Sequence, residues 1–276
     1  MSVEGPDTTS ESILMNTTAS DAAIRVQGLR FAYGGAEVLH GISFEVRRGE
    51  VTGLLGPNGA GKSTTLRIIT GILRPGAGIV EVEGFALPGQ AFELKQRIGY
   101  VPEAAELYET LSAQEFLELC GRLHEIEERR LQIRIDAMVD AFDLSDERNQ
   151  RLGTYSKGMR QKVLIAAALL HDPLLIVLDE PLTGLDTDAA ALTRSLLASL
   201  AAQGRTVLYS SHVLDVVERV CARVLILDRG YLIADGSPEE LKAAARGSTL
   251  EEVFREVTHS QSVEPRIARI LDGLRS

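Results

Sequence analysis

The residues best suited to chemistry in this chain are those of the segment GPNGAGKST, which fits the pattern G-x-x-x-x-G-K-[ST]. At the start of a helix, backbone N–H groups of such a loop can cradle phosphates, because the helix dipole favours negative charge there. The lysine can reach β- and γ-phosphates, and the serine hydroxyl can ligate Mg²⁺. A chance match in a glycine-rich turn is the alternative, but the strand-like run before the segment and the helical pattern after it favour phosphate binding. The predicted phosphate-binding residues are Gly56, Pro57, Asn58, Gly59, Ala60, Gly61, Lys62, Ser63 and Thr64.

Two carboxylates end the apolar run LLIVLDEP, at Asp179 and Glu180. Carboxylates are costly to bury without a partner, so their place after a buried strand indicates a function. Asp179 suits a Mg²⁺ site, directly or through water, and Glu180 suits polarising an attacking water molecule. A solvated strand end is the alternative, and the phosphate loop makes it the weaker one.

Three further segments carry weaker signals. His212 follows the strand-like run TVLYSS and opens a helix, where an ordinary histidine is also common. Tyr33, in FAYGG, could stack on a base ring, although aromatic residues in strands are more often part of the core. In the segment TYSKGMRQK, Ser156 predicts a helix cap, and Gly158 would let a ligand approach the backbone. Because the chain already has one phosphate loop, this second anion-attracting helix start suggests a phosphate held by another molecule.

The elements that must position these residues alternate between strands and helices. Strand patterns flank the phosphate loop, helical periodicity runs from about residue 112 to 144, and strands alternate with helices again after residue 156. This order predicts an α/β fold with a mostly parallel sheet and a helical insertion. On the insertion, the periodicity predicts two apolar faces. One is made of Phe116, Leu119, Cys120 and Leu123, and the other of Leu131, Ile135, Met138, Val139 and Phe142.

Composition excludes several classes of protein. The 276 residues are 45% hydrophobic, which suffices for a substantial core, and the formal net charge of −10 argues against nucleic acid as a partner. Two widely spaced cysteines, Cys120 and Cys221, argue against a disulfide framework and fit a reducing compartment. No apolar run is long enough to span a membrane. Residues 1–20 are polar and acidic, which predicts a disordered tail rather than a signal peptide.

The order of these motifs resembles the nucleotide-binding subunit of an ABC transporter, over about residues 24 to 236. The segments that carry the resemblance are Tyr33, GPNGAGKST, IGYVPE, YSKGMRQK, LLIVLDEP, TGLD and SSH. The resemblance implies a P-loop NTPase core with an antiparallel β flank and an inserted α-helical subdomain, with ATP and Mg²⁺ as cofactors. It implies that YSKGM, with Ser156 and Gly158, binds the γ-phosphate of ATP held by a partner subunit in a head-to-tail dimer. It further implies that Asp186, in TGLD, belongs to a loop linking the two sites, and that His212 contacts the γ-phosphate.

The chain departs from the usual family pattern at three positions. Glu103 stands where glutamine is usual, and its carboxylate can still offer oxygen to Mg²⁺, with an extra negative charge. Lys157 and Met159 replace the usual glycine and glutamine of the signature. These departures, and the tail TLEEVFREVT, resemble the type-2 exporter branch. In that tail, Leu250, Val253, Phe254 and Val257 predict an apolar stripe, either for docking a partner or for packing on the chain's own core.

The resulting hypothesis is a peripheral ATPase on the cytoplasmic face of the cell membrane, powering transport through a separate transmembrane permease subunit. Its dimer would be a homodimer or a heterodimer with a similar ATPase, and the permease would dock between Glu103 and the helical insertion. The expected domains are a tail (1–20), an ATPase domain (21–236, with a helical subdomain at about 104–158) and a helical C-terminal extension (237–276).

Three other classes fit less well. ABC ATPases of DNA repair or chromosome structure carry long coiled coils between the phosphate loop and the signature, and the insertion here is too short. Translation-linked ABC proteins hold two cassettes in one chain, and this chain shows one. Nothing in a P-loop kinase or GTPase would account for the segment YSKGMRQK.

Overall fold

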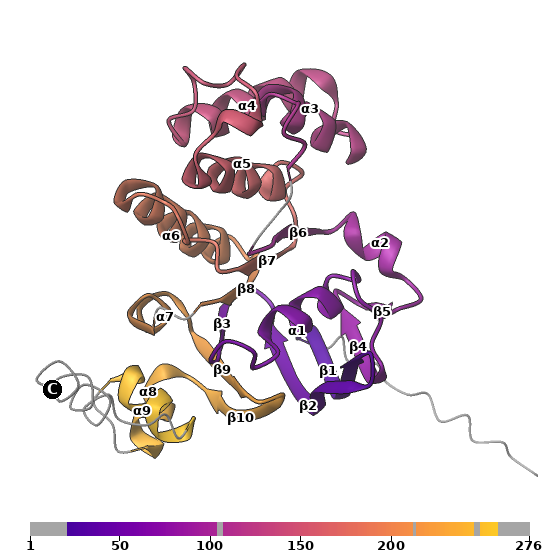
Figure 1. Cartoon of the computed structure of the whole chain (residues 1–276), viewed down its shortest axis with the longest axis vertical. Helices are drawn as coiled ribbons and strands as arrows, with labels where there is room; N and C mark the ends of the chain where they lie inside the picture. The colour runs from indigo at the N-terminus through magenta and orange to yellow at the C-terminus, as the bar shows by residue number, and fades with distance from the viewer. Residues whose placement is uncertain (1–20, 104–106, 212–213, 246–248, 259–276) are drawn as a thin grey trace, which may run out of the picture.

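The computed structural model describes residues 21–103, 107–211, 214–245 and 249–258, and its larger sheet has six strands in the order β10-β9-β3-β8-β7-β6 (Figure 1). Neighbouring strands are parallel except for β9 and β10, which are antiparallel. The strands are β3 (Val51–Leu55), β6 (Ile98–Val101), β7 (Leu175–Asp179), β8 (Thr206–Ser210), β9 (Arg223–Asp228) and β10 (Tyr231–Gly236). The predicted mostly parallel sheet is therefore confirmed.

The second sheet is the predicted antiparallel flank, with four strands in the order β2-β1-β4-β5. Its strands are β1 (Ala22–Tyr33), β2 (Ala36–Arg47), β4 (Ala77–Val82) and β5 (Phe85–Leu87). A backbone bond from the His40 N–H to the Gly230 carbonyl, 3.0 Å long, joins β2 to the turn between β9 and β10. The flank is thereby held against the edge of the larger sheet.

The core lies on both faces of the six-stranded sheet. Every residue of β3 and β7 is buried, as expected of central parallel strands covered on both sides. Because side chains alternate along a strand, Leu54 and Leu225 join a cluster with the antiparallel flank and α1, whereas Leu55 and Ile226 join a cluster with the helices. Two apolar layers, one on each face of the sheet, therefore hold the strands whose ends carry the predicted site residues.

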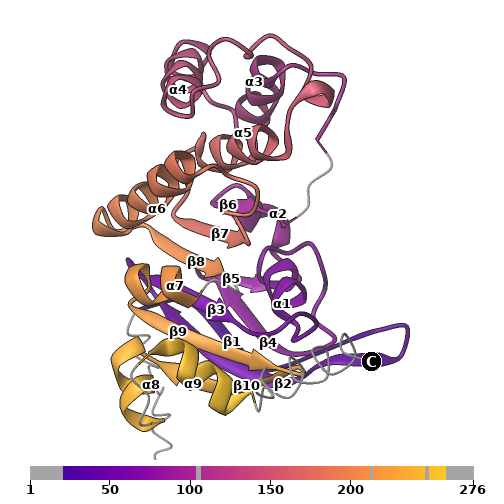
Figure 2. The same ribbon diagram turned by 60° about the vertical axis from the view of Figure 1, so that its left-hand side comes forward.

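The helices gather in groups around this core. Figures 1 and 2 show α3, α4 and α5 at one end of the molecule and α8 and α9 at the opposite end, near β10. The first seven are α1 (Lys62–Ile69), α2 (Ala91–Lys95), α3 (Ala113–Leu123), α4 (Glu128–Ala141), α5 (Lys157–Leu169), α6 (Thr187–Ala202) and α7 (Leu214–Val220), with a 3-10 turn at Leu152–Thr154.

The apolar face predicted for α3 is partly wrong. The helix starts at a capping box in which Ser112 and Glu115 satisfy each other's backbone N–H groups, and it buries the face of Ala113, Leu117 and Gly121. Of the predicted face, Phe116 and Cys120 pack only partly, while Leu119 is exposed and Leu123 is 67% exposed. Position 121 is glycine, so the side chain of Leu131 from α4 can lie against it, and this contact decides which face turns inward. On α4 the structure buries Leu131, Ile135, Val139 and the following Phe142, with Met138 partly buried, as predicted.

The C-terminal helices α8 (Pro238–Ala244) and α9 (Leu250–Val257) each begin with a capping box. Leu250 and Val253 are fully buried, and Phe254 and Val257 pack partly against the same core cluster. The tail stripe therefore packs on the chain's own core, the second of its two predicted uses. Each fully buried side chain of this kind contributes about 1.5–3 kcal/mol, so α9 is firmly seated. Within the described residues, no helix combines the length and the apolar character needed to cross a membrane.

Candidate functional site

A cavity of about 670 Å³ opens where β3 and β7 end at the same edge of the sheet. In an open α/β sheet, the carboxyl ends of parallel strands are the usual place for a ligand. Its lining consists of Val38, Gly56, Pro57, Asn58, Gly59, Ala60, Gly61, Lys62, Ser63, Thr64, Glu103, Asp179, Glu180 and Phe254. The fold thus brings the whole phosphate loop (residues 56–64) together with the predicted carboxylates.

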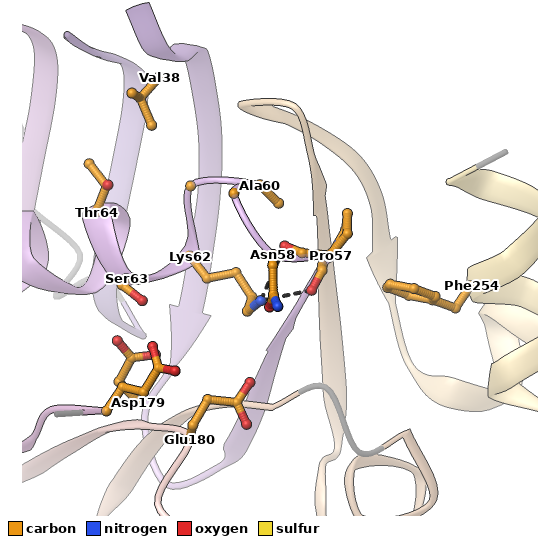
Figure 3. A pocket seen from close by; sticks show the side chains of 14 residues that line it. Val38, Pro57, Asn58, Ala60, Lys62, Ser63, Thr64, Asp179, Glu180 and Phe254 are labelled. Atoms are coloured by element: carbon orange, nitrogen blue, oxygen red, sulfur yellow. Dashed lines mark hydrogen bonds between the residues drawn. The ribbon is translucent and has the colours of Figure 1, made fainter. Parts of the chain in front are cut away.

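The phosphate loop is held tightly at its base. The Lys62 ammonium donates hydrogen bonds to the carbonyl oxygens of Gly56, 2.7 Å away, and Pro57, 3.3 Å away (Figure 3). A Cβ atom at Gly56 would clash with the Leu227 carbonyl oxygen, so only glycine lets the loop leave β3 beside β9. Lys62 is only 7% exposed and pairs with loop carbonyls, so a phosphate entering the pocket meets an ammonium already directed into the loop.

Asp179 is the last residue of β7 and Glu180 follows it directly; the two are nearly buried, at 1% and 8% exposed. The Ser210 hydroxyl donates to the Asp179 carboxylate at 2.6 Å, while the Glu180 N–H donates to both oxygens of Ser210 at 3.2 Å. Glu180 has φ of +51°, a strained value for a residue with a side chain. Figure 3 shows its carboxylate pointing into the cavity below Lys62, with Asp179 below Ser63. Ser210 and the strained turn thus fix two carboxylates in one pocket.

The donor atoms in this pocket fit a magnesium–nucleotide complex. The Ser63 hydroxyl and the carboxylates of Asp179 and Glu103 are hard oxygen ligands, which Mg²⁺ prefers together with phosphate oxygens. Among the residues that the structure describes, no group of three His, Cys, Asp or Glu side chains is arranged to hold a metal ion alone. The hydroxyl and carboxylate oxygens named above are the protein ligands that the pocket offers to a metal.

Tyr33 does not line the cavity, although it was a candidate for stacking on a base. It lies at the end of β1, is half-exposed, and packs edge-on against Phe31 with ring centroids 4.8 Å apart. Burial works against the charge of Arg67, but hydrogen bonding to Tyr33 helps to hold the pKa of that guanidinium above its usual value. The exposed ring stands next to the helix of the phosphate loop, outside the phosphate pocket.

The other three candidates, Ser156, Gly158 and Asp186, lie outside the cavity as well. Ser156 is exposed and caps α5, its hydroxyl accepting a bond from the Met159 N–H at 3.2 Å. Asp186 caps α6, where the Ala189 N–H, 2.8 Å away, and then Lys162, 3.1 Å away, lower the pKa of its carboxyl. The chain therefore carries a second, exposed anion-attracting helix start, separate from its own phosphate pocket.

The start of α5 packs directly on the loop formed by residues 181–186. A Cβ atom at Gly158 would clash with the Gly184 carbonyl oxygen, so the glycine is needed for this packing. That reason differs from the predicted one, which was room for a ligand. The Gln161 amide donates to the Pro181 carbonyl at 3.1 Å, and the stem of Lys157 lies over Gly184. The helix start and this loop thus form one surface.

Sequence reasoning missed two residues that line the cavity. Val38 reaches the cavity from β2, and Phe254 reaches it from α9. Nothing local in the sequence marks Val38, while Phe254 was singled out only as part of an apolar stripe. His212 lies outside the described residues.

Comparisons with known proteins agree on one family. The family model described as "ABC transporter" matches residues 39–183. The daunorubicin resistance ATP-binding protein DrrA3 of Streptomyces coeruleorubidus is 40% identical over 237 residues, covering 86% of this chain and 75% of the relative. The ABC transporter ATP-binding protein NatA of Bacillus subtilis is 40% identical over 214 residues, covering 77% and 87%. A solved structure, described as the ATP binding subunit of an ABC transporter, superposes with a TM-score of 0.81 at 33% identity, covering 86% and 99%.

Proposed function

The chain belongs to the ABC transporter family, as an ATP-binding and ATP-hydrolysing subunit that powers transport, and from this premise we propose how its site works. Two such subunits close head to tail over ATP, so that the phosphate loop of one faces the Ser156 helix start of the other. The separation of these two surfaces on one chain is the observation that carries the proposal.

On the phosphate-loop side, the nucleotide phosphates lie along the backbone N–H groups of residues 56–64, and Lys62 exchanges its carbonyl partners for phosphate oxygens. Ser63, Asp179 and Glu103 would hold Mg²⁺, which supplies charge neutralisation of the phosphates when bound. Glu180 accepts a proton from the water that attacks the γ-phosphorus. Its strained backbone and the bonds to Ser210 keep that carboxylate aimed into the pocket.

On the opposite side, the exposed N-terminus of α5 presents backbone N–H groups and the Ser156 hydroxyl to the γ-phosphate held by the partner. The adjoining 181–186 loop, with Asp186 at its end, follows Glu180 directly in the chain and so links the two sites. Tyr33, which stands beside α1 outside the phosphate pocket, stacks on the adenine ring. His212 completes the γ-phosphate contacts, a role carried over from the family resemblance alone.

Transport needs a membrane-spanning partner, and we propose a separate permease subunit that docks between Glu103 and the helical insertion. Names of the similar proteins support export, since DrrA3 is a drug-resistance ATP-binding protein. The subunit would act from the cytoplasmic face of the membrane, as a homodimer or paired with a similar ATPase.

Replacing Glu180 by glutamine tests the chemistry of this proposal. Glu180→Gln keeps the size and shape of the side chain but removes the proton acceptor, so turnover should fall roughly 10²- to 10⁴-fold while ATP binding persists. Steady-state phosphate release and equilibrium binding of labelled ATP measure the two quantities.

Lys62→Ala is the matched contrast, because it removes a phosphate ligand and should weaken binding itself. Wild-type turnover in Glu180→Gln would exclude Glu180 as the proton acceptor. Absence of ATPase activity in the wild-type chain, alone and with its membrane partner, would overturn the proposed function.

A further inference from the structure

The C-terminal helix α9 contributes a wall to the nucleotide pocket. Phe254 lines the same cavity as the phosphate loop, and Figure 3 shows its ring pointing from α9 toward Pro57. Its neighbours Leu250 and Val253 on the helix are fully buried in the core, whereas Phe254 is only partly buried. The ring is therefore carried to the pocket by a helix that is itself fixed.

One carboxylate joins α9 to two neighbouring helices. Glu218, on α7, accepts a hydrogen bond from the Leu250 N–H at 3.2 Å and another from the Lys242 ammonium of α8 at 2.8 Å. Hydrogen bonding to Lys242 is the main reason that the pKa of Glu218 is lowered. Three helices thus meet at Glu218, and their arrangement determines where Phe254 lies.

The phosphate loop is less enclosed at its tip than at its base. The base is held by the bonds of Lys62 and by a backbone bond from the Gly230 N–H to the Ala60 carbonyl, 3.1 Å long. At the tip, Asn58 and Gly59 are exposed, and a Cβ atom placed on Gly59 would meet nothing within 4 Å. Pro57 lies between these regions, on the side of the cavity where Phe254 stands.

We propose that Phe254 is a positioning residue for ATP binding, which holds the phosphate loop at Pro57 in its binding conformation through the seating of α9. The inference rests on the proposed function of the pocket and adds the C-terminal extension to it. Without the ring, binding must order the loop tip, and that ordering costs affinity rather than turnover.

Steady-state ATPase kinetics of Phe254→Ala test this inference. Its KM for ATP should rise about fivefold, the loss expected from ordering roughly one extra residue, while kcat changes less than about twofold. Phe254→Leu keeps an apolar wall and should restore most of the affinity. Glu218→Ala removes the acceptor for the Leu250 N–H and Lys242 and loosens the start of α9 without touching the pocket, so it should raise KM by a smaller factor.

Val257→Ala is the matched control, because Val257 lies on α9, packs on the same core cluster and does not line the cavity. It should lower the melting temperature about as much as Phe254→Ala and leave KM unchanged. Equal KM values for wild type, Phe254→Ala and Val257→Ala would show that Phe254 only packs on the core, and would overturn the inference. Because wild-type turnover and the Glu180→Gln result would stand in that case, the failure would be distinct from a failure of the proposed function.

Discussion

The phosphate pocket and the Ser156 helix start are both suited to phosphate, yet they are built in opposite ways. The pocket is concave and holds Lys62, Asp179 and Glu180 almost out of contact with solvent. The helix start is exposed, and its capping serine and the adjoining Asp186 line no part of that pocket. One surface can enclose a nucleotide, whereas the other can only be pressed against one. This contrast is the reason for our proposal that a second molecule supplies the helix start that faces each pocket.

The helix start also differs from the pocket in what fixes its shape. Lys62 and Ser210 organise the pocket through side-chain hydrogen bonds, while the start of α5 depends on backbone packing between Gly158 and Gly184. A change at Gly158 should therefore act first on the helix start and the 181–186 loop, and leave the phosphate loop and Lys62 in place.

Among the substitutions that distinguish the phosphate pocket from the Ser156 helix start, Gly158→Ala should have the largest effect on ATPase activity. Alanine is the better helix former, so the substitution favours α5 locally, but its Cβ would clash with the Gly184 carbonyl and displace the 181–186 loop. A displaced partner surface should lower ATPase activity roughly 10- to 100-fold, while ATP affinity of the monomer stays within about twofold of wild type.

Gly89→Ala is its matched control, since a Cβ there would meet only the Ala86 carbonyl at 3.8 Å. ATPase assays and equilibrium ATP binding on both variants provide the comparison. Wild-type activity in Gly158→Ala, or an equal loss of monomer binding, would break the distinction between the two surfaces.

Glu103→Gln should have the smallest effect on ATPase activity, and it tests only the metal ligands of the phosphate pocket. Removing one of its three carboxylates leaves a weaker attraction for Mg²⁺, so the Mg²⁺ concentration for half-maximal ATPase should rise about two- to threefold. The measurement is ATPase rate against free Mg²⁺ at saturating ATP. An unchanged Mg²⁺ dependence with transport uncoupled from hydrolysis would instead assign Glu103 to communication with the permease.

Local spacing was enough to predict the strands, the phosphate loop and the carboxylates at the end of β7, because each depends on neighbours in the chain. Long-range contacts decided what the sequence could not show. On α3, Leu117 rather than Leu119 and Leu123 turns inward, because α4 packs its Leu131 against Gly121.

The site also combines residues that local spacing predicts with residues that only long-range contacts bring in. The phosphate loop assembles from consecutive residues, but Val38 and Phe254 reach the cavity from β2 and α9. An apolar position at helical spacing predicts burial, and does not tell which surface it will meet. Tyr33 and Gly158 were predicted from residue types that suit a ligand. In the structure Tyr33 packs against Phe31, and Gly158 packs against the Gly184 carbonyl.

The central claim, that two chains complete each ATP site, is tested most directly by mixing two defective chains. Lys62→Ala has a disabled phosphate loop and an intact helix start, and Ser156→Arg has an intact loop and a helix start blocked by bulk. Each homodimer then has two defective sites, whereas a mixed dimer gathers both defects in one site and leaves the other intact.

Both chains should also carry Glu180→Gln, so that bound nucleotide is trapped rather than hydrolysed, and different affinity tags should isolate mixed dimers. We expect labelled ATP to be retained at up to one molecule per mixed dimer and to be lost from either homodimer. If isolated mixed dimers retain no more ATP than the homodimers at any mixing ratio, Ser156 is only a helix cap and each site is built within one chain.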